Sequence, residues 1–211
     1  MTESSQTLDR GLRVLALLAD SPRGRSVTEL AAELGVARAV VYRLLATLRA
    51  HNLVLPARDG RVRVGLGVLD LARRVRPLLA EAASGPLRRL AEDLGATAHL
   101  TVVDGTDAVA MAVVEPSWTD LHVAYRVGSR HPLERGAAGR AILLGRQPPP
   151  RAPHAATAGE LQPGAHGVAA PVLDVPGLEA SVGVVTLVEL DPAAVGPRVV
   201  QAAAAVTAAL H

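Results

Sequence analysis

The chain has 211 residues, of which 49 % are hydrophobic, so it can bury a core either as one large domain or as two small ones. It contains no cysteine, which excludes disulfide bonds, thiolate metal sites and cysteine nucleophiles. Its first residues are polar, and no run of uncharged apolar residues is long enough to cross a membrane. We therefore expect a soluble, cytoplasmic protein.

The formal net charge of +2 hides an asymmetry between the two parts of the chain. Residues 1–76 contain 13 Arg and 7 acidic residues, a net charge of +6, whereas residues 77–211 contain 9 Arg and 13 acidic residues, a net charge of −4. The basic part favours a polyanionic partner. An arginine-rich composition without such a partner is the alternative.

Helical spacing of apolar residues predicts three helices in the basic part. The first has Thr7 as its N-cap, ends before Ser21-Pro22 and presents one apolar face, made by Leu8, Leu12, Leu15 and Leu18. The second is short, begins after Ser26 and ends at Gly35 as a left-handed C-cap. The third runs to about Ala50 and turns four residues inward, namely Val41, Leu44, Leu45 and Leu48.

The periodicity changes to two over residues 53–65, where Asp59-Gly60 separates two alternating segments and predicts a β-hairpin. Three helices followed by a hairpin are the order of a winged helix. A linking helix follows, in which Pro77 is expected to cause a kink or an interruption. Its predicted apolar face consists of Val68, Leu71, Ala72, Val75 and Leu79.

Beyond Ser84-Gly85-Pro86 the pattern predicts an antiparallel sheet flanked by helices. The expected helices cover residues 86–94, 136–144 and 193–210, and the expected strands cover 97–103, 108–114, 121–127, 167–173 and 180–188. The proline-rich segment 147–163 is expected to be a loop. The predicted organisation is thus a winged helix-turn-helix domain (1–65), a linker helix (66–84) and a C-terminal domain (85–211).

Four residues, Ala31, Gly35, Val41 and Leu44, have the spacing that is typical of a helix-turn-helix. Ala31 is small where the two helices touch, Gly35 supplies the positive φ of the turn, and Val41 with Leu44 holds the second helix against the first. An ordinary helical hairpin is the alternative. The helix before this unit and the hairpin after it favour the DNA-binding interpretation.

The third helix is therefore predicted to enter the major groove of DNA. Arg43 can donate two hydrogen bonds to a guanine edge or bind a phosphate, and arginines of the hairpin can contact the backbone beside it. The predicted DNA-binding residues are Ser26 and Thr28 at the start of the second helix, Arg38, Ala39, Val40, Tyr42, Arg43 and Thr47 on the third, and Arg58, Arg61 and Arg63 on the hairpin.

The sequence resembles the IclR-type transcriptional regulators. In the first domain the resemblance runs from Ser5 to about Arg73 and includes the segments TLDRGLRVLALL, SVTELAAELGVARAVVYRLLATL and DGRVRVG. In the second domain three segments resemble the family in the right order, namely HLTVVDGTDAVAMAVVE, RVGSRHPLERGAAGRAILL and ELQPGAHGVAAPVLD.

The resemblance implies a mixed α/β (α+β) protein with a GAF-like C-terminal domain that binds a small organic acid or aromatic effector. It also implies a homodimer, or a tetramer, that binds a palindromic operator as a repressor or an activator, without a cofactor. The effector pocket that it implies has free amides at the start of the 136–144 helix, which suit a carboxylate. Its candidate residues are Leu121, Val123, Tyr125, Arg135, Gly136, Ala137, Ala138, Gly139, Arg140, Glu160, Ala169 and Ala170.

The chain departs from the family pattern in two places. Ala39-Val40 replaces the usual Ser-Thr pair of the recognition helix, and most of the segment before Glu160 is missing. The second departure favours an alternative, a ligand-independent regulator whose C-terminal domain only dimerises or binds a protein. An enzyme is not expected, because no GxSxG or HExxH motif occurs. A metal shared by His122 and His131 is a distant option.

Overall fold

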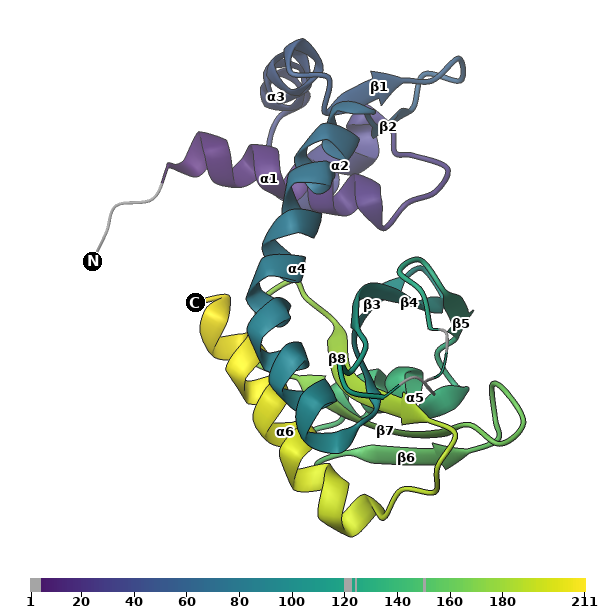
Figure 1. The fold of residues 1–211 in the computed structure, drawn as a ribbon. Coiled ribbons are helices and arrows are strands. Elements are labelled where there is room, and N and C mark those ends of the chain that lie inside the picture. Colours follow the sequence, from purple (N-terminus) through teal and green to yellow (C-terminus); the bar gives the residue numbers. More distant parts are fainter. Residues whose placement is uncertain (1–4, 120–122, 124, 150) are drawn as a thin grey trace. The chain divides into compact units, whose positions relative to one another are not determined.

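The computed structural model describes residues 5–119, 123, 125–149 and 151–211, and it consists of two compact units (Figure 1). The first unit covers Met1–Val75 and the second covers Arg76–His211. The boundary lies inside a long helix, α4 (Gly67–Leu94), which begins in the first unit and ends in the second. The functional division into 1–65, 66–84 and 85–211 remains a prediction.

The first unit is built on the three predicted helices, α1 (Gln6–Ala19), α2 (Val27–Leu34) and α3 (Arg38–Ala50). A capping box formed by Ser26 and Glu29 begins α2, and Gly35 ends it with φ 65° and ψ 36°. The four inward residues predicted for α3 are all buried. They share one core with Val14, Leu18 and Leu30, so the helix-turn-helix is confirmed.

Two details of α1 were predicted wrongly. Its N-cap is Ser5, whose hydroxyl accepts a hydrogen bond from the Leu8 N–H, and not Thr7. Its buried face is made by Gly11, Val14 and Leu18, whereas Leu8 and Leu12 are 63 % and 57 % exposed. The helix carries more leucines than one face can bury, so leucine spacing alone did not identify the face that meets the core.

The hairpin that forms the wing consists of β1 (Val54–Pro56) and β2 (Val62–Val64), with Val54 opposite Val64. The Ala57 N–H donates to the Arg61 carbonyl at 2.8 Å, which closes a three-residue loop with Gly60 at φ 77°. On its other edge β2 pairs with the loop before α2 through two backbone hydrogen bonds between Arg25 and Val62. The wing is therefore tied to the helices.

α4 differs from the predicted linker in its extent. Of the kink or interruption expected at Pro77, the interruption does not occur, and residues 86–94, predicted as a separate helix, are the last part of α4. The carbonyl that Pro77 leaves without a helical partner belongs to exposed Arg73, where water can hydrogen-bond it. The predicted apolar face is largely exposed in its first half: Leu71 and Val75 are 60 % and 50 % exposed, and only Leu79 is buried.

The second unit contains one antiparallel six-stranded sheet with the order β5-β4-β3-β8-β7-β6. The strands are β3 (Thr97–Asp104), β4 (Asp107–Val114), β5 (Arg130–Pro132), β6 (Ala155–Ala158), β7 (His166–Val172) and β8 (Ala180–Thr186). The helices are α5 (Gly136–Gly145) and α6 (Pro192–Ala209). The predicted mixed α/β fold, with helices around an antiparallel sheet, is confirmed.

The two faces of this sheet have different partners (Figure 1). One face supplies Leu100, Val168 and Val182 to the main core, which α6 and the second half of α4 complete. The other face carries His99, Ser181 and Ala169 and is covered by α5. Because neighbouring residues of a strand point to opposite faces, the polar residues of β3 are brought to the α5 side.

Two segments differ from the prediction. Of residues 121–127, predicted as a strand, those that the structure describes belong to no strand, and β5 takes the sheet edge beside β4 instead. Within the predicted 147–163 loop, residues 155–158 form β6. This four-residue stretch contains no proline and lies at the other sheet edge, where only one side of the strand needs pairing.

Candidate nucleic-acid interface and ligand pocket

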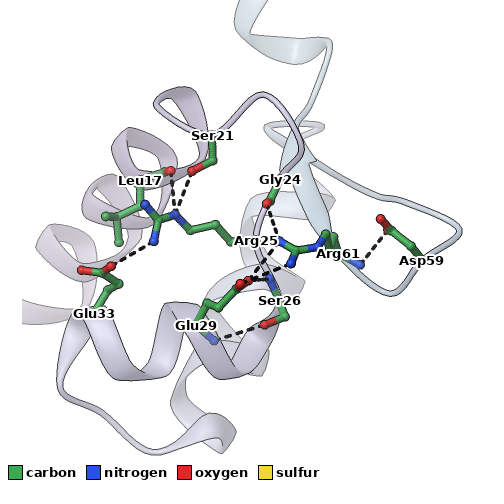
Figure 2. A network of polar contacts seen from close by, with 9 residues as sticks. All are labelled: Leu17, Ser21, Gly24, Arg25, Ser26, Glu29, Glu33, Asp59 and Arg61. Atoms are coloured by element: carbon green, nitrogen blue, oxygen red, sulfur yellow. Dashed lines mark hydrogen bonds and ion pairs between the residues drawn. The ribbon is translucent and has the colours of Figure 1, made fainter.

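A polar network holds the wing against the start of α2 (Figure 2). The Arg61 guanidinium donates to the Gly24 carbonyl at 2.9 Å and binds both carboxylate oxygens of Glu29, at 3.1 and 3.2 Å. Hydrogen bonds from Ser26 and the charge of Arg61 hold the pKa of Glu29 below its usual range. Sequence reasoning placed Arg61 on DNA, but this guanidinium is engaged inside the unit.

A second arginine, Arg25, fixes the other side of the same loop and was not singled out from the sequence. Its Nε donates to the Ser21 hydroxyl at 2.9 Å, and its Nη1 forms a 3.0 Å ion pair with Glu33 (Figure 2). The cap residue Ser26 is likewise engaged with Glu29 in both directions. These groups hold the wing and the loop before α2 against α1 and α2.

The outward side of α3 is a continuous exposed surface. Arg38, Ala39, Tyr42, Arg43 and Thr47 are all exposed, and the Tyr42 ring is 61 % exposed. Thr47 donates its hydroxyl proton to the Arg43 carbonyl at 3.2 Å, which leaves its oxygen as an acceptor. Val40 is half-buried and packs against the core, so it is the predicted α3 contact least available to DNA.

Four arginines of the predicted interface have free guanidinium groups as far as the described residues show. Arg38 and Arg43 lie on α3, and Arg58 and Arg63 lie on the wing, all four exposed and without a hydrogen-bond or ion-pair partner among those residues. Thr28 on α2 is exposed as well. The unit thus separates two kinds of arginine, those that hold the wing and those that face solvent.

The second unit contains a small pocket of about 80 Å³ on the α5 side of the sheet. Six predicted effector residues line it, namely Val123, Tyr125, Gly136, Ala137, Ala138 and Glu160. Residues that sequence reasoning missed complete the wall: His99, His131, Thr157, Leu161, Gln162, Ala165, His166, Gly167, Val184 and Val185. For His99 and Val185, alternation with buried core residues along β3 and β8 was the available signal.

The start of α5 does not offer the free amide that was expected at Gly136. The Gly136 N–H donates to Glu160 Oε2 at 3.0 Å, and Glu160 Oε1 forms a 2.8 Å ion pair with Arg140. Arg135 donates to the backbone carbonyl of Glu160. At Gly136, the chain's own carboxylate therefore occupies the place that a ligand carboxylate was expected to take.

The remaining predicted effector residues that the structure describes, Arg135, Gly139, Arg140, Ala169 and Ala170, are not part of the pocket wall. Gly139 packs against the backbone of Leu133, where a Cβ would lie 2.3 Å from a carbonyl oxygen. Ala169 packs between α5 and the sheet, and Ala170 points into the core on the opposite face. Leu121 lies outside the described residues. An effector role for any of the predicted residues stays a prediction.

Buried polar groups distinguish this pocket from an ordinary core. His99 Nδ1 lies 3.1 Å from the Thr101 hydroxyl, and its ring packs 5.1 Å from that of Tyr125. Burial, followed by repulsion from a protonated His131 ring, lowers the pKa of His99 to about 3. Burial also raises the pKa of Tyr125, and Thr101 partly offsets the rise. Both side chains are uncharged near neutral pH.

The buried His99 makes the second unit sensitive to acid. The unfolded chain binds a proton at His99 below its ordinary pKa of about 6.5, whereas the folded state does so only near 3, so protonation favours unfolding between these values. His99 alone then lowers stability by up to about 1.4 kcal/mol per pH unit as the pH falls. Urea unfolding followed by Trp118 fluorescence should show this slope, and His99→Gln should reduce it. Equal slopes for both proteins would contradict this account.

The described residues form neither a metal site nor a membrane-spanning helix. No group of three or more His, Asp or Glu side chains is arranged to hold a metal ion there. The option of a metal shared by His122 and His131 cannot be placed, because His122 lies outside the described residues. None of the described helices combines the length and apolarity needed to span a membrane.

Comparison with known families matches both units. Residues 7–56 match the IclR helix-turn-helix domain, and residues 75–154 match the IclR C-terminal domain of bacterial transcriptional regulators. The first match covers α1, α2, α3 and β1. The second runs from α4 to the loop before β6.

Individual proteins agree with this assignment. The chain is 31 % identical over 148 residues to the acetate operon repressor of Salmonella typhimurium, covering 68 % of this chain and 54 % of that protein. The chain thus spans about half the length of the curated relatives that it matches.

Solved structures share the fold over nearly the whole chain. An IclR-family regulator from Rhodococcus sp. is 22 % identical with a TM-score of 0.59, over 99 % of this chain and 97 % of that one. An IclR homolog from Microbacterium hydrocarbonoxydans, complexed with 4-hydroxybenzoate, is 16 % identical with a TM-score of 0.57, over 97 % and 99 %. Together with the helix-turn-helix geometry, these matches show that the chain belongs to the IclR family of bacterial transcriptional regulators.

Proposed function

We propose that this protein is a sequence-specific DNA-binding transcriptional regulator whose α3 reads the major groove. The observation that carries the proposal is the exposed α3 surface, where Arg38 and Arg43 face solvent while Arg25 and Arg61 hold the wing. Exposed guanidinium groups on a recognition helix can reach guanine edges and phosphates. Arg58 and Arg63 on the wing would add backbone contacts that depend on salt. Arg61 is left out of this proposed interface.

The proposed regulator acts as a homodimer. The first unit exposes six large apolar residues that its own core does not use, on α1 and on α4 with the loop before it, namely Leu8, Leu12, Leu66, Leu69, Leu71 and Val75. Four of the six, Leu66, Leu69, Leu71 and Val75, lie within ten residues of one another, and exposed apolar residues that gather in one patch mark an interaction surface. A second copy of the same chain would bury it and would supply two α3 helices for a palindromic operator.

We further propose that a small molecule controls DNA binding through the pocket beside α5. The pocket contains unpaired polar groups, and a structural relative carries 4-hydroxybenzoate. The alternative is a ligand-independent regulator whose second unit only dimerises or binds a protein. The small pocket volume favours that alternative, and the buried polar groups favour ligand binding. No catalytic activity is proposed, and a regulator of chromosomal genes would act in the cytoplasm.

Selection of bound fragments from genomic DNA tests the proposed function. We expect enriched fragments to share an inverted repeat whose half-site centres lie about 10 bp, or a multiple of that, apart. The same selection with Arg43→Ala should enrich no motif. Fragments bound by the unaltered protein without any shared motif would contradict a sequence-specific regulator.

A further inference from the structure

In the α5 pocket, His131 Nε2 lacks a hydrogen-bond partner among the described residues. The Tyr125 hydroxyl has no partner of good hydrogen-bond geometry there either, although the Thr101 hydroxyl lies near enough to lower the pKa of Tyr125. His131 is only 7 % exposed, so water outside the protein does not readily replace the missing partner. Leaving such a group unpaired costs about 1–3 kcal/mol. These residues are therefore placed for a partner that enters the pocket.

The geometry around His131 indicates what kind of partner is missing. His131 Nδ1 lies 3.0 Å from the Pro132 carbonyl, which can only accept a hydrogen bond, so Nδ1 carries the proton. In the neutral ring, Nε2 is then an acceptor and needs a donor. The Tyr125 hydroxyl can both donate and accept. A hydroxyl group suits both residues, because it donates through its hydrogen and accepts at its oxygen.

The same pocket is poorly suited to an anion. Gly136 and Arg140, which could hold a ligand carboxylate, are already bound to Glu160 at 3.0 and 2.8 Å. The Glu160 carboxylate stands in the wall, so a ligand carboxylate would have to displace it from Gly136 and Arg140. The other titratable groups of the wall are His99, His131 and His166, together with Tyr125. Of these, His99 is held neutral by burial.

The rest of the wall is suited to an apolar body, since Val123, Leu161 and Val185 line it. We propose that this pocket binds a small uncharged compound with an apolar body and a hydroxyl group, such as a phenol or an alcohol, in preference to a carboxylate. This inference rests on the proposed control of the regulator by a ligand. It assigns that ligand to a chemical class.

Calorimetric titration of the full chain, without DNA, tests the ligand class with two matched pairs of probes, phenol against benzoate and cyclohexanol against cyclohexanecarboxylate. We expect each hydroxyl compound to bind at least about tenfold more tightly than its matched acid. Tyr125→Phe should weaken phenol binding about fivefold or more without lowering the melting temperature, because it removes an unpaired buried hydroxyl.

Glu160→Gln serves as the matched variant for charge. Its amide oxygen can still accept from the Gly136 N–H, but the negative charge is gone, so benzoate should gain affinity and phenol should not. Acids that bind the unaltered protein as tightly as the hydroxyl compounds would overturn the proposal. So would the absence of hydroxyl-probe binding up to about 10 mM. A hydroxyl probe that binds but leaves operator affinity unchanged would support the ligand class and contradict ligand control.

Discussion

Arg43→Ala is expected to weaken operator binding about 100-fold while leaving the melting temperature unchanged. Each arginine contact to a guanine edge contributes about 1–3 kcal/mol, and a dimer makes the contact twice. Arg43 is exposed and has no ion-pair partner among the described residues, so its loss removes no internal contact. Fluorescence anisotropy with the selected operator measures the affinity, and circular dichroism measures the stability.

Arg198→Ala is the matched control for this experiment. Arg198 is an exposed arginine of α6 in the second unit, so its replacement removes the same charge without touching α3. We expect its operator affinity to stay within about twofold of the unaltered protein. Retained affinity in Arg43→Ala, or an equal loss in both variants, would show that α3 does not read the operator through Arg43.

Gly24→Ala is expected to destabilise the first unit by roughly 2–5 kcal/mol. Gly24 has φ 73°, a left-handed conformation that costs a residue with a Cβ about 1–2 kcal/mol. The added Cβ would also lie 2.4 Å from the Val62 carbonyl oxygen, which accepts the Arg25 N–H, and relieving such overpacking costs about 1–3 kcal/mol. Calorimetry should show a lower unfolding temperature for the first unit.

Gly60→Ala separates the cost of the left-handed backbone conformation from the cost of the steric clash with β2. Gly60 lies in the same wing with φ 77°, but a Cβ there would meet no atom within 4 Å. Its replacement should therefore cost only the backbone term, about 1–2 kcal/mol. Similar destabilisation by the two variants would mean that the close approach of Gly24 to β2 does not help to hold the wing.

The sequence predicted the elements of the first unit well because local signals agree there. The Ser26 cap, the Gly35 turn and the spacing of the α3 core residues all favour one arrangement, and the structure contains it. The sequence was a poorer guide to which apolar helix faces are buried within the unit and which are exposed. Leu8 and Leu71 were assigned to apolar helix faces from their spacing, but spacing does not distinguish a face that meets the core from one that a second molecule would cover.

The ligand pocket was predicted only in part, because its polar wall comes from long-range pairing. Gly136 and Glu160 were identified from a family resemblance, and the structure brings them together in one hydrogen bond. That this bond occupies the expected anion site was not visible in the sequence. His99 and His131 were missed as pocket residues because lone histidines do not indicate a ligand site by themselves, and only the register of the sheet turns them toward α5.

The most direct test of the account is the affinity of the purified protein for its selected operator and for a scrambled duplex of the same length, at about 50 and 200 mM salt. We predict much tighter binding to the operator at both salt concentrations, and a steep loss of affinity for both duplexes as salt increases. Equal affinity for the two duplexes would contradict sequence-specific recognition by α3.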